Sequence, residues 1–86
     1  MLPFNLQKNR SIMVLTDLNV GEKAIIKNFN NPQVELVMTD MGCPLGTTIE
    51  LYHKTLSNGP LSIKTASGNL LAIRSNEAKN LIIRKQ

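Results

Sequence analysis

The sequence predicts a mainly β fold, a small, partly open barrel of about five short strands with one inserted α-helix. Short segments of alternating apolar and polar residues recur at regular intervals after residue 47, separated by turns rich in Gly, Asn, Ser and Pro. A single segment with the apolar spacing of a helix lies between the first strand and the others. With 86 residues, the chain has room for one domain and one core.

The first strand is expected over residues 23–29, after a capped turn and a reversal at Gly21. The apolar side chains of that turn, Leu15, Leu18 and Val20, are expected to point inward. Residues 1–14 are predicted to be a loosely ordered N-terminal extension, with the barrel domain over residues 15–86. Within the extension, the apolar residues 12–14, together with Leu15, could add an edge strand or dock against the core.

A helix of about ten residues is expected to begin after Asn31, because Asn is a favoured N-cap and Pro32 suits the first helical position. Gly42 is expected to end the helix in the left-handed conformation. Its apolar residues follow the i, i+3, i+4, i+7 spacing of one buried stripe: Val34, Val37, Met38 and Met41.

Four more strands are expected over residues 48–54, 61–65, 70–74 and 81–84, with turns at 57–60 and 66–69 and one capped helical turn at 75–79. In the first of these, strict alternation places Ile49, Leu51 and His53 on the inner face and Lys54 on the outer face. The strand pattern and the helix stripe together predict a core that includes Ile26, Val37, Met41, Ile49, Leu51, Ile63 and Ile73.

The charge balance is basic, with 10 Lys and Arg against 6 Asp and Glu, and a formal net charge of +4. Such an excess suits an acidic protein surface, an anionic membrane or nucleic acid, and it also keeps a small domain soluble. Lys54, Lys64 and Arg74 are predicted to form a basic stripe on the outer face. Nucleic acid is not expected as the partner, because the aromatic side chains on which bases stack are missing.

We expect a cytoplasmic binding protein and not an enzyme. The chain contains no nucleophile–base pair, metal-ligand cluster or phosphate-binding loop. It has no apolar run of the roughly 18 residues that a membrane helix needs, so no insertion into a membrane is expected. The single cysteine, Cys43, precludes an internal disulfide and fits a reducing compartment.

Three segments occur in a characteristic order: Leu-Asn-Val-Gly-Glu-Lys-Ala at 18–24, Met-Gly-Cys-Pro-Leu-Gly-Thr at 41–47, and Leu-Ala-Ile-Arg-Ser-Asn-Glu-Ala at 71–78. In this order and spacing, over about residues 15–84, the chain resembles the ferrous iron transport protein A (FeoA) family. The resemblance implies an SH3-like barrel and an accessory role in bacterial ferrous iron uptake. The implied partner is the GTPase-containing membrane transporter (FeoB), bound through its cytoplasmic part. Two features depart from the family pattern. Pro44 stands one position before the place, directly ahead of glycine, that proline usually has in the second segment. The basic residue that often occupies the end of the helix, just before Met-Gly, is absent here, where the sequence is Met38-Thr39-Asp40.

The partner-binding surface is expected at the turn after the helix and at the loop near residue 58. The residues concerned are Met41, Gly42, Pro44, Leu45, Gly46, Asn58 and Pro60. Pro44, Leu45 and Pro60 would supply the apolar anchors that protein interfaces use.

No resident cofactor is expected. Cys43 and His53 are weak metal-ligand candidates, since their spacing, even with Asp40 added, matches no known zinc pattern. Fe²⁺ is therefore expected to bind weakly, if at all. Two alternatives stay open: a metal- or anion-responsive module, since the same fold is appended to iron-dependent repressors, and a nucleic-acid-binding SH3-like barrel, which the basic charge favours.

Overall fold

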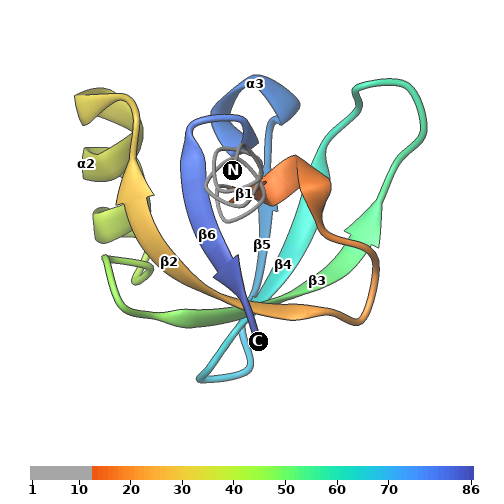
Figure 1. Cartoon of the computed structure of the whole chain (residues 1–86), viewed down its shortest axis with the longest axis horizontal. Coiled ribbons are helices and arrows are strands. Elements are labelled where there is room, and N and C mark those ends of the chain that lie inside the picture. The colour runs from red at the N-terminus through yellow and green to blue at the C-terminus, as the bar shows by residue number, and fades with distance from the viewer. Residues whose placement is uncertain (1–12) are drawn as a thin grey trace, which may run out of the picture.

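Six antiparallel strands form one curved sheet in residues 13–86, the part of the chain that the computed structural model describes (Figure 1). The strand order is β1-β6-β2-β3-β4-β5, so β1 and β5 are the two edges and the barrel is partly open. The elements are β1 (Met13–Val14), the 3-10 turn η1 (Leu15–Asp17), β2 (Lys23–Phe29), α2 (Pro32–Asp40), β3 (Thr48–Lys54), β4 (Leu61–Thr65), β5 (Leu70–Ile73), α3 (Ser75–Ala78) and β6 (Leu81–Lys85). The predicted fold class is confirmed.

The sixth strand is β1, the edge strand that the apolar residues before η1 could form. Met13 pairs with Ile83 and Val14 with Ile82, both on β6. The predicted N-terminal extension over 1–14 otherwise lies outside the described residues.

Helix α2 begins and ends as the sequence predicts. The Asn31 side-chain oxygen accepts hydrogen bonds from the backbone N–H groups of Gln33 and Val34, at 2.8 and 3.4 Å. At the other end, Gly42 has a φ of +88°. The N–H of Gly42 donates to the Thr39 carbonyl at 3.1 Å and that of Cys43 to the Met38 carbonyl at 2.8 Å, which is the Schellman arrangement. The arrangement turns Cys43 back toward Met38, and both side chains are buried.

Two residues predicted to be inward do not lie in the core. Val37 is 44% exposed, because only the strip of α2 around Met38 faces the sheet and Val37 is at the margin of that strip. Val20 is 59% exposed. It occupies the tip of a tight turn, which the N–H of Glu22 closes onto the carbonyl of Asn19 at 3.0 Å. Met41 is half-buried against the core.

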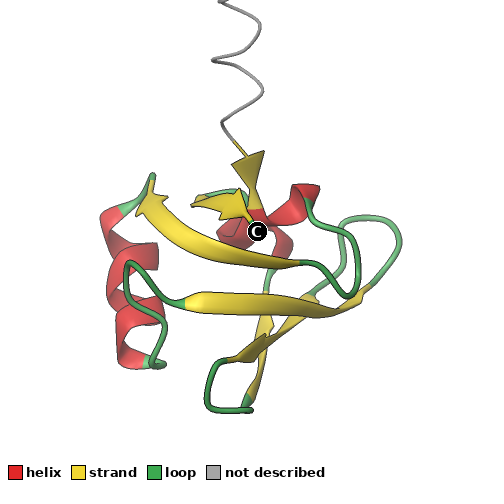
Figure 2. Ribbon diagram, turned by 60° about the horizontal axis from the view of Figure 1, so that its bottom comes forward, coloured by secondary structure: helices red, strands yellow, loops and turns green. Residues whose placement is uncertain are grey.

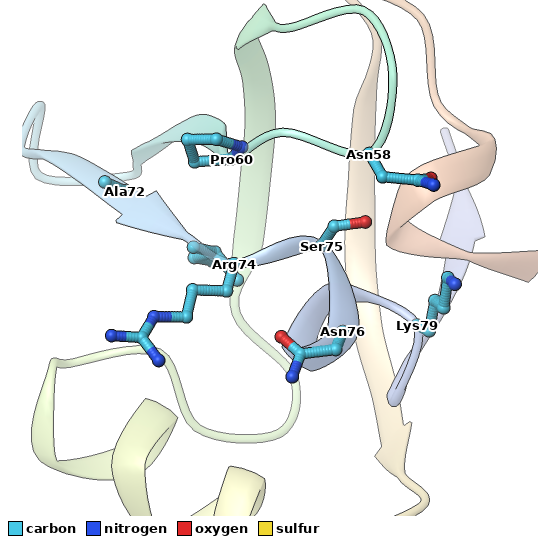
Figure 3. Close-up of a pocket in the computed structure, with 8 residues that line it drawn as sticks. Asn58, Pro60, Ala72, Arg74, Ser75, Asn76 and Lys79 are labelled. Carbon is cyan, nitrogen blue, oxygen red and sulfur yellow. The ribbon is translucent and has the colours of Figure 1, made fainter.

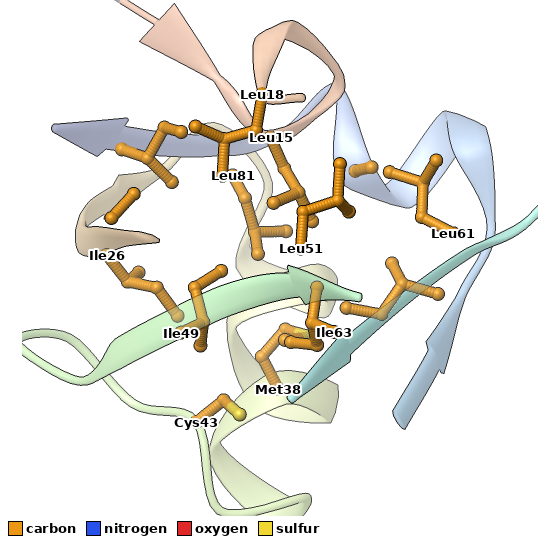
Figure 4. Close-up of a cluster of buried hydrophobic side chains, with 14 residues drawn as sticks. Leu15, Leu18, Ile26, Met38, Cys43, Ile49, Leu51, Leu61, Ile63 and Leu81 are labelled. Carbon is orange, nitrogen blue, oxygen red and sulfur yellow. The ribbon is translucent and has the colours of Figure 1, made fainter. Parts of the chain in front are cut away.

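The core is aliphatic and is enclosed by the inner face of the sheet (Figure 4). Figure 2 shows α2 on one side of the sheet, away from η1 and α3, which contact each other. The predicted core positions on the strands are confirmed as buried: Ile26, Ile49, Leu51, Ile63 and Ile73.

A β-bulge in β3 overturns the prediction of strict alternation along this strand. Leu51 pairs with Ile63 on β4, but the next pairs are His53 with Ser62 and Lys54 with Leu61. The extra residue reverses the faces, so His53 is exposed on the outer face and Lys54 lies on the inner side, level with buried Leu61.

Because of this reversal, the Lys54 ammonium group reaches backbone carbonyls of the η1 segment. Its Nζ donates hydrogen bonds to the backbone carbonyls of Thr16 at 2.8 Å and Leu18 at 2.9 Å. Lys54 therefore fastens the segment around η1 to the end of β3. The basic stripe predicted from Lys54, Lys64 and Arg74 does not form, because Lys54 belongs to the opposite face.

Truncation of Leu51 is expected to destabilise the domain by about 2–5 kcal/mol, because the residue is fully buried at the centre of the sheet. The measurement is urea unfolding of Leu51→Ala followed by circular dichroism. Leu56→Ala, which truncates a side chain that is 91% exposed, is the control and should stay within about 0.5 kcal/mol of the parent. Equal stability of both variants would contradict the buried position of Leu51.

Replacement of Lys54 by Met is expected to cost about 1–3 kcal/mol, because two carbonyl groups lose a charged hydrogen-bond donor. Lys64→Met removes a charge from the exposed face of β4 and is the matched control. If both variants unfold at the same denaturant concentration, Lys54 does not fasten the η1 segment.

Candidate functional site

An open groove of about 660 Å³ lies beside the end of β5 (Figure 3). One side comes from the β3–β4 loop, and the other from β5 and α3. The residues that line it are Asn58, Pro60, Ala72, Ile73, Arg74, Ser75, Asn76 and Lys79. We call it the β5 groove. Its volume is in the range of ordinary ligand-binding clefts.

Local hydrogen bonds hold the α3 side of the β5 groove in place. The backbone N–H of Arg74 donates to Glu77 Oε1 at 3.2 Å, and the N–H groups of Glu77 and Ala78 donate to the Arg74 carbonyl at 3.0 and 2.9 Å. The side chain of Asn80 donates to the Asn76 carbonyl at 2.9 Å. Arg74 therefore stands at a defined turn between β5 and α3 although its side chain is exposed.

The loop side is shaped by a close approach at Gly59. A Cβ at this position would lie 2.1 Å from Thr55 Oγ1 and 2.9 Å from Thr55 Cβ, so only glycine fits. Thr55 Oγ1 donates to the Pro60 carbonyl at 3.0 Å. Ser57 and Asn58 take the left-handed conformation, with φ values of 64° and 60°. The predicted turn is confirmed, and it presents Asn58 and Pro60 to the β5 groove.

The other predicted partner-binding residues lie at the opposite end of β3, because the 41–47 turn precedes this strand and the 57–60 loop follows it (Figure 1). Pro44 and Leu45 are exposed in the turn. Gly46 has a φ of +85°, and its N–H donates to the Ile26 carbonyl at 2.8 Å, which ties the turn to β2. The structure thus separates the predicted set into Met41, Gly42, Pro44, Leu45 and Gly46 at one end, and Asn58 and Pro60 at the other.

The two metal-ligand candidates lie in different environments. Cys43 is fully buried beside Met38 in the core, and burial raises the pKa of its thiol (Figure 4). His53 is exposed on the outer face, opposite Ser62. Over residues 13–86, no three His, Cys, Asp or Glu side chains gather in a way that could hold a metal ion.

Sequence reasoning missed most of the β5 groove. Arg74 entered only as a member of a basic stripe, and Lys79 was not singled out. The available signal was the third family-like segment at 71–78, which supplies most of the groove's β5 and α3 side.

None of the helices in residues 13–86 is long and apolar enough to cross a membrane.

Several solved structures are similar to this chain. The crystal structure of an iron uptake regulatory protein, FeoA, has a TM-score of 0.77 and 25% sequence identity, over 87% of this chain and 99% of that one. FeoA of Stenotrophomonas maltophilia, crystallised with zinc and described as a prokaryotic SH3 domain protein, has a TM-score of 0.69 and 18% identity, over 83% of this chain and 88% of that one.

A manganese-dependent transcriptional repressor in complex with manganese also shares the fold. Its TM-score is 0.78 at 16% identity, over 87% of this chain but only 37% of the repressor. The sequence matches no curated protein. The FeoA domain model matches residues 13–85, which is nearly the whole described region. This chain therefore belongs to the FeoA domain family.

Proposed function

We propose that this chain is a small accessory protein of bacterial ferrous iron uptake that works in the cytoplasm. It binds the cytoplasmic, GTPase-containing part of the ferrous iron transporter (FeoB-like) and modulates its assembly or nucleotide cycle, with no catalysis of its own. The observation that carries the proposal is the match of the FeoA domain to residues 13–85. The likeness to an iron uptake regulatory protein over 99% of that protein's length supports it.

The surface best suited to the transporter is the α2 side of the molecule. Leu36 and Val37 are exposed on the helix, by 63% and 44%, and Leu45 is 49% exposed in the turn that follows. Apolar side chains that remain exposed in the free protein are the anchors that interfaces bury. The Schellman end of α2 and the bond from Gly46 to Ile26 hold the turn in one conformation, so little ordering is needed on binding.

Replacement of Leu45 by Asp is expected to weaken binding to the purified GTPase domain at least tenfold, because a charge would enter a desolvated contact. Leu56→Asp is the matched control, since Leu56 is exposed at the other end of β3 and its replacement should leave the affinity unchanged. Calorimetry measures the affinity, and circular dichroism checks that both variants are folded.

Two results would contradict the proposal: the absence of binding by the parent protein, or an equal loss in both variants. Nanomolar binding to single-stranded DNA at physiological salt, without binding to the GTPase domain, would favour the nucleic-acid alternative. Such binding would be almost purely electrostatic here and should fall steeply as salt is raised.

Fe²⁺ and Zn²⁺ are expected to bind no tighter than micromolar, because Cys43 is buried and His53 is exposed on the outer face. The measurement is anaerobic calorimetry on the reduced protein. A one-to-one event of higher affinity, abolished in both Cys43→Ser and His53→Ala, would contradict this expectation. It would instead favour the metal-responsive module.

A further inference from the structure

Strand β5 is an unusually open edge of the sheet. It is the last strand in the order and pairs only with β4 among residues 13–86. Its sequence is Leu-Leu-Ala-Ile, with no charged residue and no proline. Natural edge strands usually carry such residues, because they prevent another strand from pairing there. The other edge, β1, has only two residues in the described part of the chain.

The hydrogen-bond alternation identifies the backbone groups that are available on β5. The N–H of Thr65 donates to the Asn69 carbonyl at 2.8 Å, where the β4–β5 hairpin begins. Hydrogen-bonded pairs recur at every second residue of an antiparallel ladder, so Leu71 and Ile73 use their N–H and C=O groups with β4. Leu70 and Ala72 direct theirs away from β4, toward the open side.

The backbone of Arg74 agrees with this alternation. It is the next residue of the outward set, and its N–H and C=O are bonded to Glu77 and Ala78 of the α3 turn instead of to β4. The free edge therefore ends at Arg74. From there, the β5 groove continues past α3.

Both charged residues that line the β5 groove are cations, while the nearby Glu77 carboxylate is engaged with the backbone N–H of Arg74. Arg74 and Lys79 are exposed, and no carboxylate is among the groove's lining residues. Neither cation forms an ion pair in the described part of the chain. Lys64, the cross-strand partner of Leu70, adds a third cation beside the edge and stands opposite Glu50 of β3 on its other side.

We propose that the β5 edge and the β5 groove bind an extended, carboxylate-bearing segment of a partner protein as an added strand. The peptide backbone pairs with Leu70 and Ala72, and its carboxylates contact Arg74 and Lys79. Backbone pairing supplies affinity in this mode of recognition, and the side chains supply selectivity. The inference is independent of the transporter, because it specifies the chemistry of the segment and not the protein that carries it.

Charge also favours an acidic segment over a second copy of this chain as the occupant. The β5 edge of a second copy would bring the sequence Leu-Leu-Ala-Ile followed by Arg74, which contains no carboxylate. Arg74 and Lys79 would then gain no opposite charge from the added strand, whereas an acidic segment supplies one.

The test uses the full chain labelled with ¹⁵N and two blocked octapeptides, one of four Glu-Thr repeats and one of four Lys-Thr repeats. The acidic peptide is expected to shift the amide signals of Leu70, Ala72 and Arg74, and to slow hydrogen exchange at Leu70 and Ala72. Ala72→Pro removes an outward N–H and no bond to β4, so it should weaken binding about three- to tenfold. If Ala72→Pro fails to fold, the hydrogen exchange of the Leu70 and Ala72 amides in the parent protein, with and without the acidic peptide, still tests the proposal.

The double variant R74E/K79E should weaken binding of the acidic peptide at least tenfold. The control is K27E/R84E, which makes the same change of net charge on exposed residues of β2 and β6 and should cost less than twofold. The proposal is wrong if millimolar acidic peptide shifts no signal, if the Lys-Thr peptide binds as well, or if both double variants lose equal affinity. A concentration-dependent dimer that Ala72→Pro abolishes would also overturn it, because the edge would then pair with a second copy.

Discussion

The structure depends on the curvature of a single sheet. The chain contains no Trp, two Phe and one Tyr, so the core must be filled by small aliphatic side chains. Such a core is thin, and short strands can enclose it only if they bend strongly. Two register shifts supply bending, one between Ile26 and Asn28 in β2 and one between Leu51 and His53 in β3. The two bulged strands are neighbours at the middle of the sheet.

The bulge in β3 also determines how the η1 segment is attached to the end of this strand. By placing Lys54 on the inner side, it puts an ammonium group where two carbonyls of the η1 segment would otherwise lack a donor. The segment after β1 is thereby attached to the strand that carries the β3–β4 loop. That loop is then narrowed by the contact between Gly59 and Thr55, and it forms one wall of the β5 groove. A deviation in backbone register thus shapes the surface on which we propose that a partner segment binds.

Local sequence signals predicted the elements well, and they failed where the outcome depends on distant parts of the chain. Asn31, Pro32 and Gly42 mark the ends of α2 because capping involves only neighbouring backbone groups. The face assigned to His53 and Lys54 was wrong, because no residue near Tyr52 signals a bulge and the shift becomes visible only in the pairing with β4. The binding surface was predicted to combine two loops that the structure places at opposite ends of β3. The β5 groove escaped prediction because its walls are far apart in the chain.

The α2 side and the β5 side of the molecule carry side chains that act on different steps of binding, the lifetime of a complex and the rate of encounter. The α2 end presents apolar side chains, which gain free energy when water is excluded and mainly prolong the lifetime of a complex. Within residues 13–86, the cations at the β5 end form no ion pair and the outer edge of β5 pairs with no strand. Charges there accelerate encounter with an acidic partner and orient it, but salt weakens them. On the two proposals made above, the barrel holds one protein by its apolar α2 side, while a second segment, from the same protein or another, pairs with the β5 edge.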